Sequence, residues 1–225
     1  MAFEGVIFDL DGTLADTLTD IASSMNRVLQ VHGYPVHPEE DYKLLVGRGL
    51  DNLVKQALPA DSRLPDVVSV CQDEMIEDYE ANCLVKTSLY KGIRELLREL
   101  TALGKPFSLF SNKTEPLTLK IVNYLLGDVR FVRVMGARPG FPKKPDPAGA
   151  LLISDEMGIP PEKLIYMGDS DVDMMTANRA GMFAVGVLWG FRSGEELLAN
   201  GAVTLLNKPG ELLELPGWNF KNRVV

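Results

Sequence analysis

The amino-acid sequence predicts an α/β fold: a doubly wound parallel sheet with helices on both faces, interrupted by an all-helical insert. Two observations predict it. Between residues 93 and 187, apolar runs of strand length alternate with segments of helical periodicity, a pattern typical of parallel sheets. Residues 16–83, in contrast, carry helical patterns and no strand signal. We therefore expect a core domain of residues 1–15 and 84–225 and a helical domain of residues 16–83.

The first predicted element is a buried strand. Residues 6–8 are β-branched or aromatic and wholly apolar, as expected of a strand covered on both faces. Side chains two positions apart on a strand point the same way, so Asp9 and Asp11 can converge where this strand ends. Gly12 then allows a tight turn.

The insert follows directly. Thr13 or Asp16 can cap its first helix, in which apolar residues recur at helical spacing over residues 18–29. Further helices are expected from Pro38 and over residues 50–58 and 67–79. About seventy residues is a typical size for a small subdomain.

The rest of the chain alternates. Strands are predicted at residues 106–110, 131–135, 164–167 and 182–187, with a weaker one at 203–205. Helices are predicted at residues 93–103, 117–126, 147–157 and 171–180, with short ones at 194–199 and 209–215. This order supports a sheet built from βαβ units.

The composition of the chain limits the kinds of binding partner that it can have. The chain has 225 residues, of which 46% are hydrophobic and 24% charged, and a net charge of −8, as in ordinary globular proteins. The negative charge argues against nucleic acid as a partner but not against a small phosphorylated substrate. No stretch reaches membrane-spanning length, and the start of the chain lacks a secretion signal. We expect a cytoplasmic protein, a monomer or homodimer, with Cys71 and Cys83 reduced.

Asp9 and Asp11 predict a metal site. Two carboxylates this close repel each other, and a divalent cation removes the repulsion. Mg²⁺ suits the position because it prefers oxygen ligands and often bridges carboxylates to phosphate. The alternative is that residues 9–12 form only a turn before a helix, because Asp and Gly are common turn residues.

Further polar residues follow the other strands, where open parallel sheets bind ligands. They are Ser111, Asn112 and Lys113; Lys143 and Lys144; and Asp169, Ser170, Asp171 and Asp173. Each group has a structural alternative: a helix cap, a solvated loop lysine, or acidic residues at a helix N-terminus. Their joint occurrence at successive strand ends favours a phosphate-transfer site.

The order of these groups resembles the four motifs of the haloacid dehalogenase superfamily of phosphohydrolases. Residues 9–13, Asp-Leu-Asp-Gly-Thr, are similar to its first motif. Ser111, Lys144 and Asp169 stand at the positions of the other three. The resemblance covers nearly the whole chain and implies a Rossmann-like core whose helical insert is a cap domain. An acid at position 11 implies phosphoryl transfer rather than dehalogenation.

The resemblance also implies roles for these residues. Asp9 is the expected nucleophile, which forms an aspartyl-phosphate. Asp11 is the expected general acid and base. Ser111 and the backbone amide near Asn112 are expected to bind the phosphoryl group, whose charge Lys144 neutralises. Lys144 is preferred to its neighbour Lys143 because it directly precedes a proline.

The expected Mg²⁺ ligands are the side chains of Asp9 and Asp169 and, by resemblance, the backbone carbonyl of Asp11. Asp173 lies on the same side of the following helix as Asp169 and can orient a metal-bound water or Lys144.

Two segments bear on the substrate. Arg48, in a glycine-flanked turn of the insert, either binds a substrate carboxylate or belongs to a mere interhelix loop. Residues 186–192 and 144–147 are similar to segments of phosphoglycolate phosphatase-like members. Alternatives are a pyrophosphatase or nucleotide 5′-phosphatase, a β-phosphoglucomutase-type phosphomutase, and a non-catalytic binding protein. The phosphomutase fits less well because those members carry Glu where this chain has Gly168.

Overall fold

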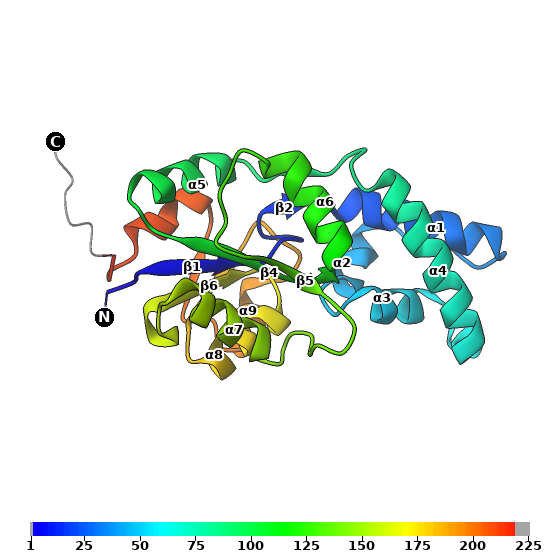
Figure 1. The fold of residues 1–225 in the computed structure, drawn as a ribbon. Coiled ribbons are helices and arrows are strands. Elements are labelled where there is room, and N and C mark those ends of the chain that lie inside the picture. The colour runs from blue at the N-terminus through cyan, green and yellow to red at the C-terminus, as the bar shows by residue number, and fades with distance from the viewer. Residues whose placement is uncertain (1, 219–225) are drawn as a thin grey trace.

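The computed structural model describes residues 2–218 and contains one six-stranded parallel sheet (Figure 1). Its order is β5-β4-β1-β6-β7-β8. The strands are β1 (Gly5–Phe8), β4 (Phe107–Thr114), β5 (Val134–Ala137), β6 (Leu164–Gly168), β7 (Phe183–Val187) and β8 (Thr204–Leu206). The chain builds outward from β1 on one side and then returns to its other side. Ligands of such sheets bind beyond the carboxyl ends of the strands at this switch point.

Helices cover both faces of the sheet (Figure 1). Alternate residues of β1 enter different cores: Val6 and Phe8 pack in one cluster and Ile7 in the other. The first cluster includes α5 (Ile93–Ala102) and α6 (Glu115–Leu126), and the second includes α7 (Ala148–Met157), α8 (Asp171–Ala180) and α9 (Gly194–Ala199). This confirms the predicted doubly wound α/β architecture.

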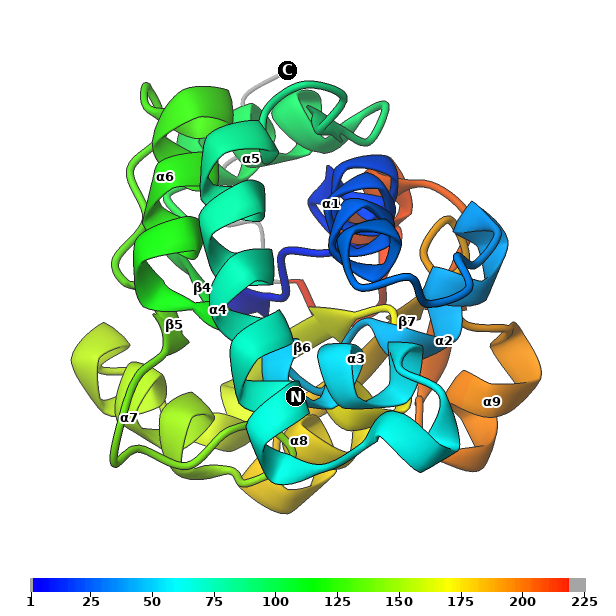
Figure 2. The same ribbon diagram turned by 90° about the vertical axis from the view of Figure 1, so that its right-hand side faces the viewer.

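The insert forms a group of helices over the carboxyl ends of the strands (Figures 1 and 2). Its helices are α1 (Leu18–Val31), α2 (Tyr42–Leu45), α3 (Leu50–Ala57) and α4 (Pro65–Asn82), with 3₁₀ turns η1 (Glu39–Asp41) and η2 (Ala60–Ser62). Helix α4 packs against both α1 and α3. The division into domains at residues 16 and 83 stays a prediction.

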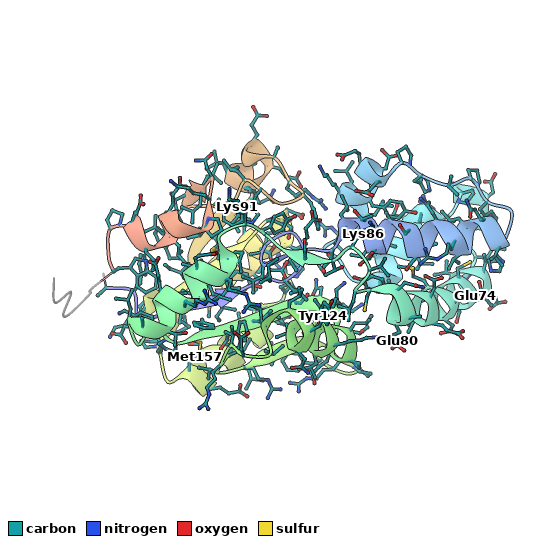
Figure 3. The ribbon with its side chains drawn as sticks, turned by 90° about the horizontal axis from the view of Figure 1, so that it is seen from above. Glu74, Glu80, Lys86, Lys91, Tyr124 and Met157 are labelled. Carbon is teal, nitrogen blue, oxygen red and sulfur yellow. The ribbon has the colours of Figure 1, made fainter. Side chains whose placement is uncertain are left out.

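The chain enters and leaves the insert side by side. β2 (Ala15–Asp16) pairs antiparallel with β3 (Ser88–Leu89). The buried Asp20 carboxylate accepts the N–H groups of Lys86 and Thr87 and the Thr87 hydroxyl at 2.8–3.0 Å. Figure 3 shows Lys86 between the helical group and the sheet. These bonds join the returning segment to α1.

Several predicted boundaries differ from the structure. β4 runs to Thr114, four residues beyond its predicted end, because polar residues here are buried in the site. β5 is assigned from Val134 rather than residue 131, although Val132 N–H already donates to Phe107 O at 2.9 Å. The helix predicted at residues 209–215 is the 3₁₀ turn η4 (Pro209–Glu214), and the one expected from Pro38 is η1 followed by α2.

No helix within residues 2–218 has both the length and the apolar character needed to cross a membrane.

Candidate active site

Asp9 and Asp11 follow β1 at the switch point of the sheet. The backbone N–H of Asp9 donates to Met167 O on the neighbouring strand at 3.0 Å, which continues the pairing of β1 with β6. Gly12 has φ +79°, and a Cβ there would lie 2.1 Å from Asp169 Oδ2. Gly12 is therefore needed both for the turn and for the close approach of Asp169.

Thr13 does not cap α1, contrary to the prediction. The helix begins at Leu18, and the Thr13 hydroxyl instead donates to Asp169 Oδ1 at 3.3 Å. Asp16 Oδ1 accepts the N–H of Leu18 at 3.4 Å. The turn between Asp9 and α1 is longer than predicted. It is held by Leu10 O, which accepts the backbone N–H groups of Thr13, Leu14 and Ala15.

Lys144 joins Asp9 to Asp173. Its buried ammonium lies 2.8 Å from Asp9 Oδ1 and 2.7 Å from Asp173 Oδ1. Asp173 is held in turn, because its Oδ2 accepts the hydroxyl and the N–H of Ser170 in a capping box at the start of α8. Lys143, in contrast, pairs with Asp51 at 2.6 Å. Lys144 and not its neighbour thus contacts the predicted nucleophile.

Asn112 holds the backbone of Lys144. Its side-chain oxygen accepts Lys144 N–H at 2.8 Å, and its amide donates to the carbonyls of Lys144 and Gly47 at 3.0 Å each. The Asn112 side chain therefore positions the lysine and contacts the insert. Ser111, 2% exposed, lines the same pocket as Asp9, Asp11 and Lys144.

Asp169 completes an acidic cluster. One carboxylate oxygen each from Asp9, Asp169 and Asp173 lies within 4.8 Å of the others, and all three residues are buried. Asp169 Oδ2 also accepts the backbone N–H of Phe191 at 2.8 Å. Burial raises the pKa of Asp169 well above its usual range, and the charges of Asp173 and Asp9 raise it further.

The pKa values of Asp9 and Lys144 are also shifted. Burial and the charge of Asp173 raise the pKa of Asp9 to about 7, although Lys144 opposes the shift. Burial lowers the pKa of Lys144, but Asp173 and Asp9 raise it by more, so it lies well above its usual value. The single ammonium of Lys144 thus does not neutralise the three carboxylates of Asp9, Asp169 and Asp173.

These residues fit a hard divalent cation. All three donors are carboxylate oxygens, which such cations prefer, and a cation removes the repulsion that raises the pKa of Asp9 and Asp169. Asp173 already uses one oxygen for Lys144 and the other for Ser170. Asp169 likewise accepts hydrogen bonds on both oxygens, from Thr13 and Phe191, so the choice of Asp9 and Asp169 as the metal ligands stays a prediction.

Asp11 contacts a group of residues that the sequence analysis largely missed. Its Oδ1 accepts the Thr17 hydroxyl at 2.6 Å and lies 3.1 Å from Lys113 Nζ. Lys113 also donates to the Tyr79 hydroxyl at 2.9 Å and lies 4.5 Å from the centre of that ring. Burial lowers the pKa of Lys113, but Asp11 and Tyr79 raise it by more. Neither Thr17 nor Tyr79 stands in a sequence motif, so nothing local distinguishes them.

Arg48 is not brought to this pocket. Its guanidinium pairs with Asp171 at the start of α8, and it is absent from the described residues that line the pocket. The position favours the interhelix-loop alternative over a substrate ligand.

Comparisons with known proteins agree with this geometry. Residues 6–187 match the family described as haloacid dehalogenase-like hydrolase. The chain is 30% identical over 218 residues to a phosphoglycolate phosphatase of Yersinia pestis, covering 96% of this chain and 94% of that protein. It is 31% identical over 195 residues to one of Pseudomonas putida, covering 85% of this chain and 72% of that protein.

A solved structure from Lactobacillus delbrueckii subsp. bulgaricus superposes with a TM-score of 0.89 at 27% identity and covers 95% of this chain and 98% of that one. The match in sequence and fold extends across both the sheet and the insert. The chain therefore belongs to the haloacid dehalogenase-like hydrolases and is a phosphatase of their phosphoglycolate phosphatase-like group.

Proposed function

We propose that this phosphatase hydrolyses a small phosphomonoester with Mg²⁺ through an aspartyl-phosphate on Asp9. The observation that carries the proposal is the contact of Asp9 with Lys144 beside Asp169 at the end of the central strand. A carboxylate nucleophile, a cation to balance phosphoryl charge and a cluster suited to a divalent metal are the parts that this chemistry needs.

The first step transfers the phosphoryl group to the protein. An oxygen of Asp9 forms a bond to phosphorus while the bond between phosphorus and the ester oxygen breaks. Protonated Asp11 gives its proton to the departing alcohol. Lys144 balances the negative charge that remains on the phosphoryl oxygens, and Ser111 donates a hydrogen bond to one of them.

The second step releases phosphate. Asp11, now ionised, takes a proton from a water molecule whose oxygen attacks phosphorus, and the bond to Asp9 breaks. Inorganic phosphate leaves, and both aspartates return to their starting forms. Asp9 and Asp169 would hold Mg²⁺, with the Asp11 carbonyl as a further ligand; the ion supplies positive charge that offsets the repulsion between carboxylate and phosphate.

The geometry around Gly168 argues against the phosphomutase alternative. A Cβ at this position would lie 2.3 Å from Asp173 Cγ. A glutamate here would therefore displace the carboxylate that holds Lys144. The proposal includes a small phosphorylated substrate, with phosphoglycolate the first compound to test. It also includes action in the cytoplasm as a monomer or homodimer without a nucleic-acid or membrane partner. The net charge of −8 supports only the absence of a nucleic-acid partner.

The nucleophile is tested by replacing Asp9 with asparagine. Phosphate release from a panel of phosphomonoesters, pyrophosphate and nucleotides is measured with and without Mg²⁺. We expect Mg²⁺-dependent hydrolysis by the unaltered protein and a loss on the order of 10³-fold or more in Asp9→Asn, with an unchanged circular dichroism spectrum. Asp155→Asn, an exposed change of the same chemistry on α7, should retain full activity. Retained activity in Asp9→Asn would overturn the assignment.

A further inference from the structure

The leaving-group side of the pocket has a cation of its own. Among the described residues that line the pocket, the lysines and arginines are Lys113 and Lys144 alone. Lys144 contacts Asp9, the proposed nucleophile, at 2.8 Å. Lys113 Nζ lies 3.1 Å from Oδ1 of Asp11, the proposed proton donor to the departing alcohol. Lys144 therefore serves the phosphoryl group, and Lys113 stands beside the place of the ester oxygen that leaves.

Lys113 has one N–H group without an acceptor. A lysine ammonium carries three N–H donors. In the described part of the chain, its acceptors are Asp11 Oδ1 and, at 2.9 Å, the Tyr79 hydroxyl. The Lys113 side chain is only 6% exposed, so bulk water has little access to it. The remaining N–H group is therefore available to an acceptor inside the pocket.

The Tyr79 hydroxyl is a second donor of this kind. Its oxygen accepts from Lys113, and no group within residues 2–218 accepts its own O–H. Tyr79 belongs to α4 of the insert, is buried and lines the same pocket. Because buried polar groups nearly always have a hydrogen-bond partner, two such donors side by side, one from the core and one from the insert, indicate a ligand that accepts from both.

The charge balance at Asp11 favours an anionic ligand. Asp11 Oδ1 accepts the Thr17 hydroxyl and contacts Lys113, whereas Oδ2 has no partner among the described residues. Oδ2 is therefore the oxygen that can carry the proton in the first step of the proposed mechanism. With that proton in place Asp11 is neutral, and the buried ammonium of Lys113 lacks an opposite charge, which is costly. A carboxylate on the leaving alcohol would supply this charge and accept charge-assisted hydrogen bonds.

We propose that Lys113 and Tyr79 bind a carboxylate of the leaving alcohol, so that the favoured substrates are phosphate esters of short 2-hydroxy acids. The inference rests on the proposed function and names the residues that select its substrate. Because Lys113 contacts the proton donor itself, the carboxylate fits on the carbon atom that bears the ester oxygen. Arg48, the carboxylate ligand that the sequence offers, pairs instead with Asp171, and neither residue lines the pocket.

Three substrates test the inference. The value of kcat/KM with Mg²⁺ is measured for phosphoglycolate, for ethyl phosphate, in which a methyl group replaces the carboxylate, and for 3-phosphonooxypropanoate, whose carboxylate is one carbon atom farther away. We expect phosphoglycolate to exceed 3-phosphonooxypropanoate about tenfold. The ratio of phosphoglycolate to ethyl phosphate is then compared between variants, because the reactivity of each ester and any loss at Asp11 common to both cancel in that comparison.

Variants of the two donors should change this ratio. Lys113→Met should lower it about thirtyfold and Tyr79→Phe about tenfold, as expected for hydrogen bonds to a charged group. Lys113→Arg should retain more of the ratio than Lys113→Met, because it keeps the charge. Tyr79→Phe removes only a hydroxyl and so tests the subsite even if Lys113→Met fails to fold. The exposed Lys91→Met and Tyr124→Phe, outside the pocket (Figure 3), are matched controls that should leave the ratio unchanged.

The other outcomes are equally distinct. A folded protein that hydrolyses no ester of the panel would refute the proposed function, and the inference with it. Hydrolysis with the same ratio in the unaltered protein, Lys113→Met and Tyr79→Phe would overturn the inference while the proposed function stands. A selective fall of the ratio in Arg48→Ala would also overturn it, because Arg48 would then be the carboxylate ligand.

Discussion

At the scale of single residues, Lys144 has two partners with different consequences. Asp9 is the proposed nucleophile, whereas Asp173 is fully buried and has both oxygens engaged. In the proposed mechanism, the Asp173 contact would keep the ammonium in place once Asp9 is esterified and loses its negative charge. Through Asn112, the insert loop at Gly47 is joined to the same lysine. Asp173 and Asn112 are thus positioning residues for Lys144.

The raised pKa of Asp9 predicts how Mg²⁺ binding depends on pH. Without a cation this pKa is about 7, against an ordinary 3.8, so between these values the folded protein holds a proton that Mg²⁺ must displace. The apparent affinity should rise by at least about tenfold per pH unit up to pH 7, because Mg²⁺ displaces the proton of Asp9 and, since the pKa of Asp169 is raised as well, protons held there too. Calorimetric titration with Mg²⁺ from pH 5.5 to 8 measures this.

The raised pKa of Asp9 also determines whether stability rises or falls with pH. Because the pKa is raised in the folded state, the free energy of unfolding of the metal-free protein should fall as pH rises from about 4 to 7 through this group. Mg²⁺ should restore stability at the upper end. In Asp9→Asn both dependences should become shallower, and the part that remains belongs to Asp169. A Mg²⁺ affinity independent of pH across this range would contradict the raised pKa of Asp9.

At the scale of elements, the sequence predicts the regular parts of the chain well and the short ones poorly. The strands and helices of the core appear in the expected order, because each is long enough for its periodic pattern of apolar residues to be recognised in the sequence. The β2–β3 pair has two residues in each strand and so no period. In β4, residues 111–114 are polar and so give no strand signal, although Ser111 and Asn112 are buried in the pocket and Lys113 and Thr114 are half-buried.

The same contrast holds for the site. Asp9, Lys144 and Asp169 could be predicted because each follows a strand in a local motif. Thr17 directly precedes α1, and Tyr79 lies in α4 at the spacing of that helix's other buried residues. They meet Asp11 and Lys113 only once the insert is folded over the sheet. Tertiary contact, rather than local sequence, selects them.

The hydrogen bonds that Asp20 accepts from residues 86 and 87, where the chain leaves the insert, predict a contribution to stability. Asp20→Ala leaves the N–H groups of Lys86 and Thr87 and the Thr87 hydroxyl without their acceptor. We expect the free energy of unfolding to fall by about 2–3 kcal/mol, measured by urea denaturation. Asp73→Ala, an exposed aspartate within α4, should change it by no more than about 0.5 kcal/mol. If Asp20→Ala lowered the free energy of unfolding by no more than the control, these hydrogen bonds would not stabilise the protein as predicted.

At the scale of the whole molecule, the loop after β7 links the acidic cluster, the β1 loop and the insert. Phe191 N–H donates to Asp169, and the Trp189 indole donates to Thr13 O at 3.0 Å. The Arg192 guanidinium donates to the carbonyls of Leu44 and Val46 at 3.3 and 3.0 Å. Docking of the insert and placement of Asp169 therefore share one segment of the core.

Removing the Arg192 guanidinium should loosen the insert without altering the reacting groups. Arg192→Met keeps the apolar stem but leaves the Leu44 and Val46 carbonyls without this donor. Since Val46 lines the pocket, we expect KM for the best phosphomonoester substrate to rise about tenfold, which corresponds to one charged hydrogen bond, while kcat falls by a smaller factor. Steady-state kinetics measures the split, with Arg98→Met on the exposed surface of α5 as the matched control. A fall in kcat at constant KM would instead show that this loop acts through Asp169 and not through the insert.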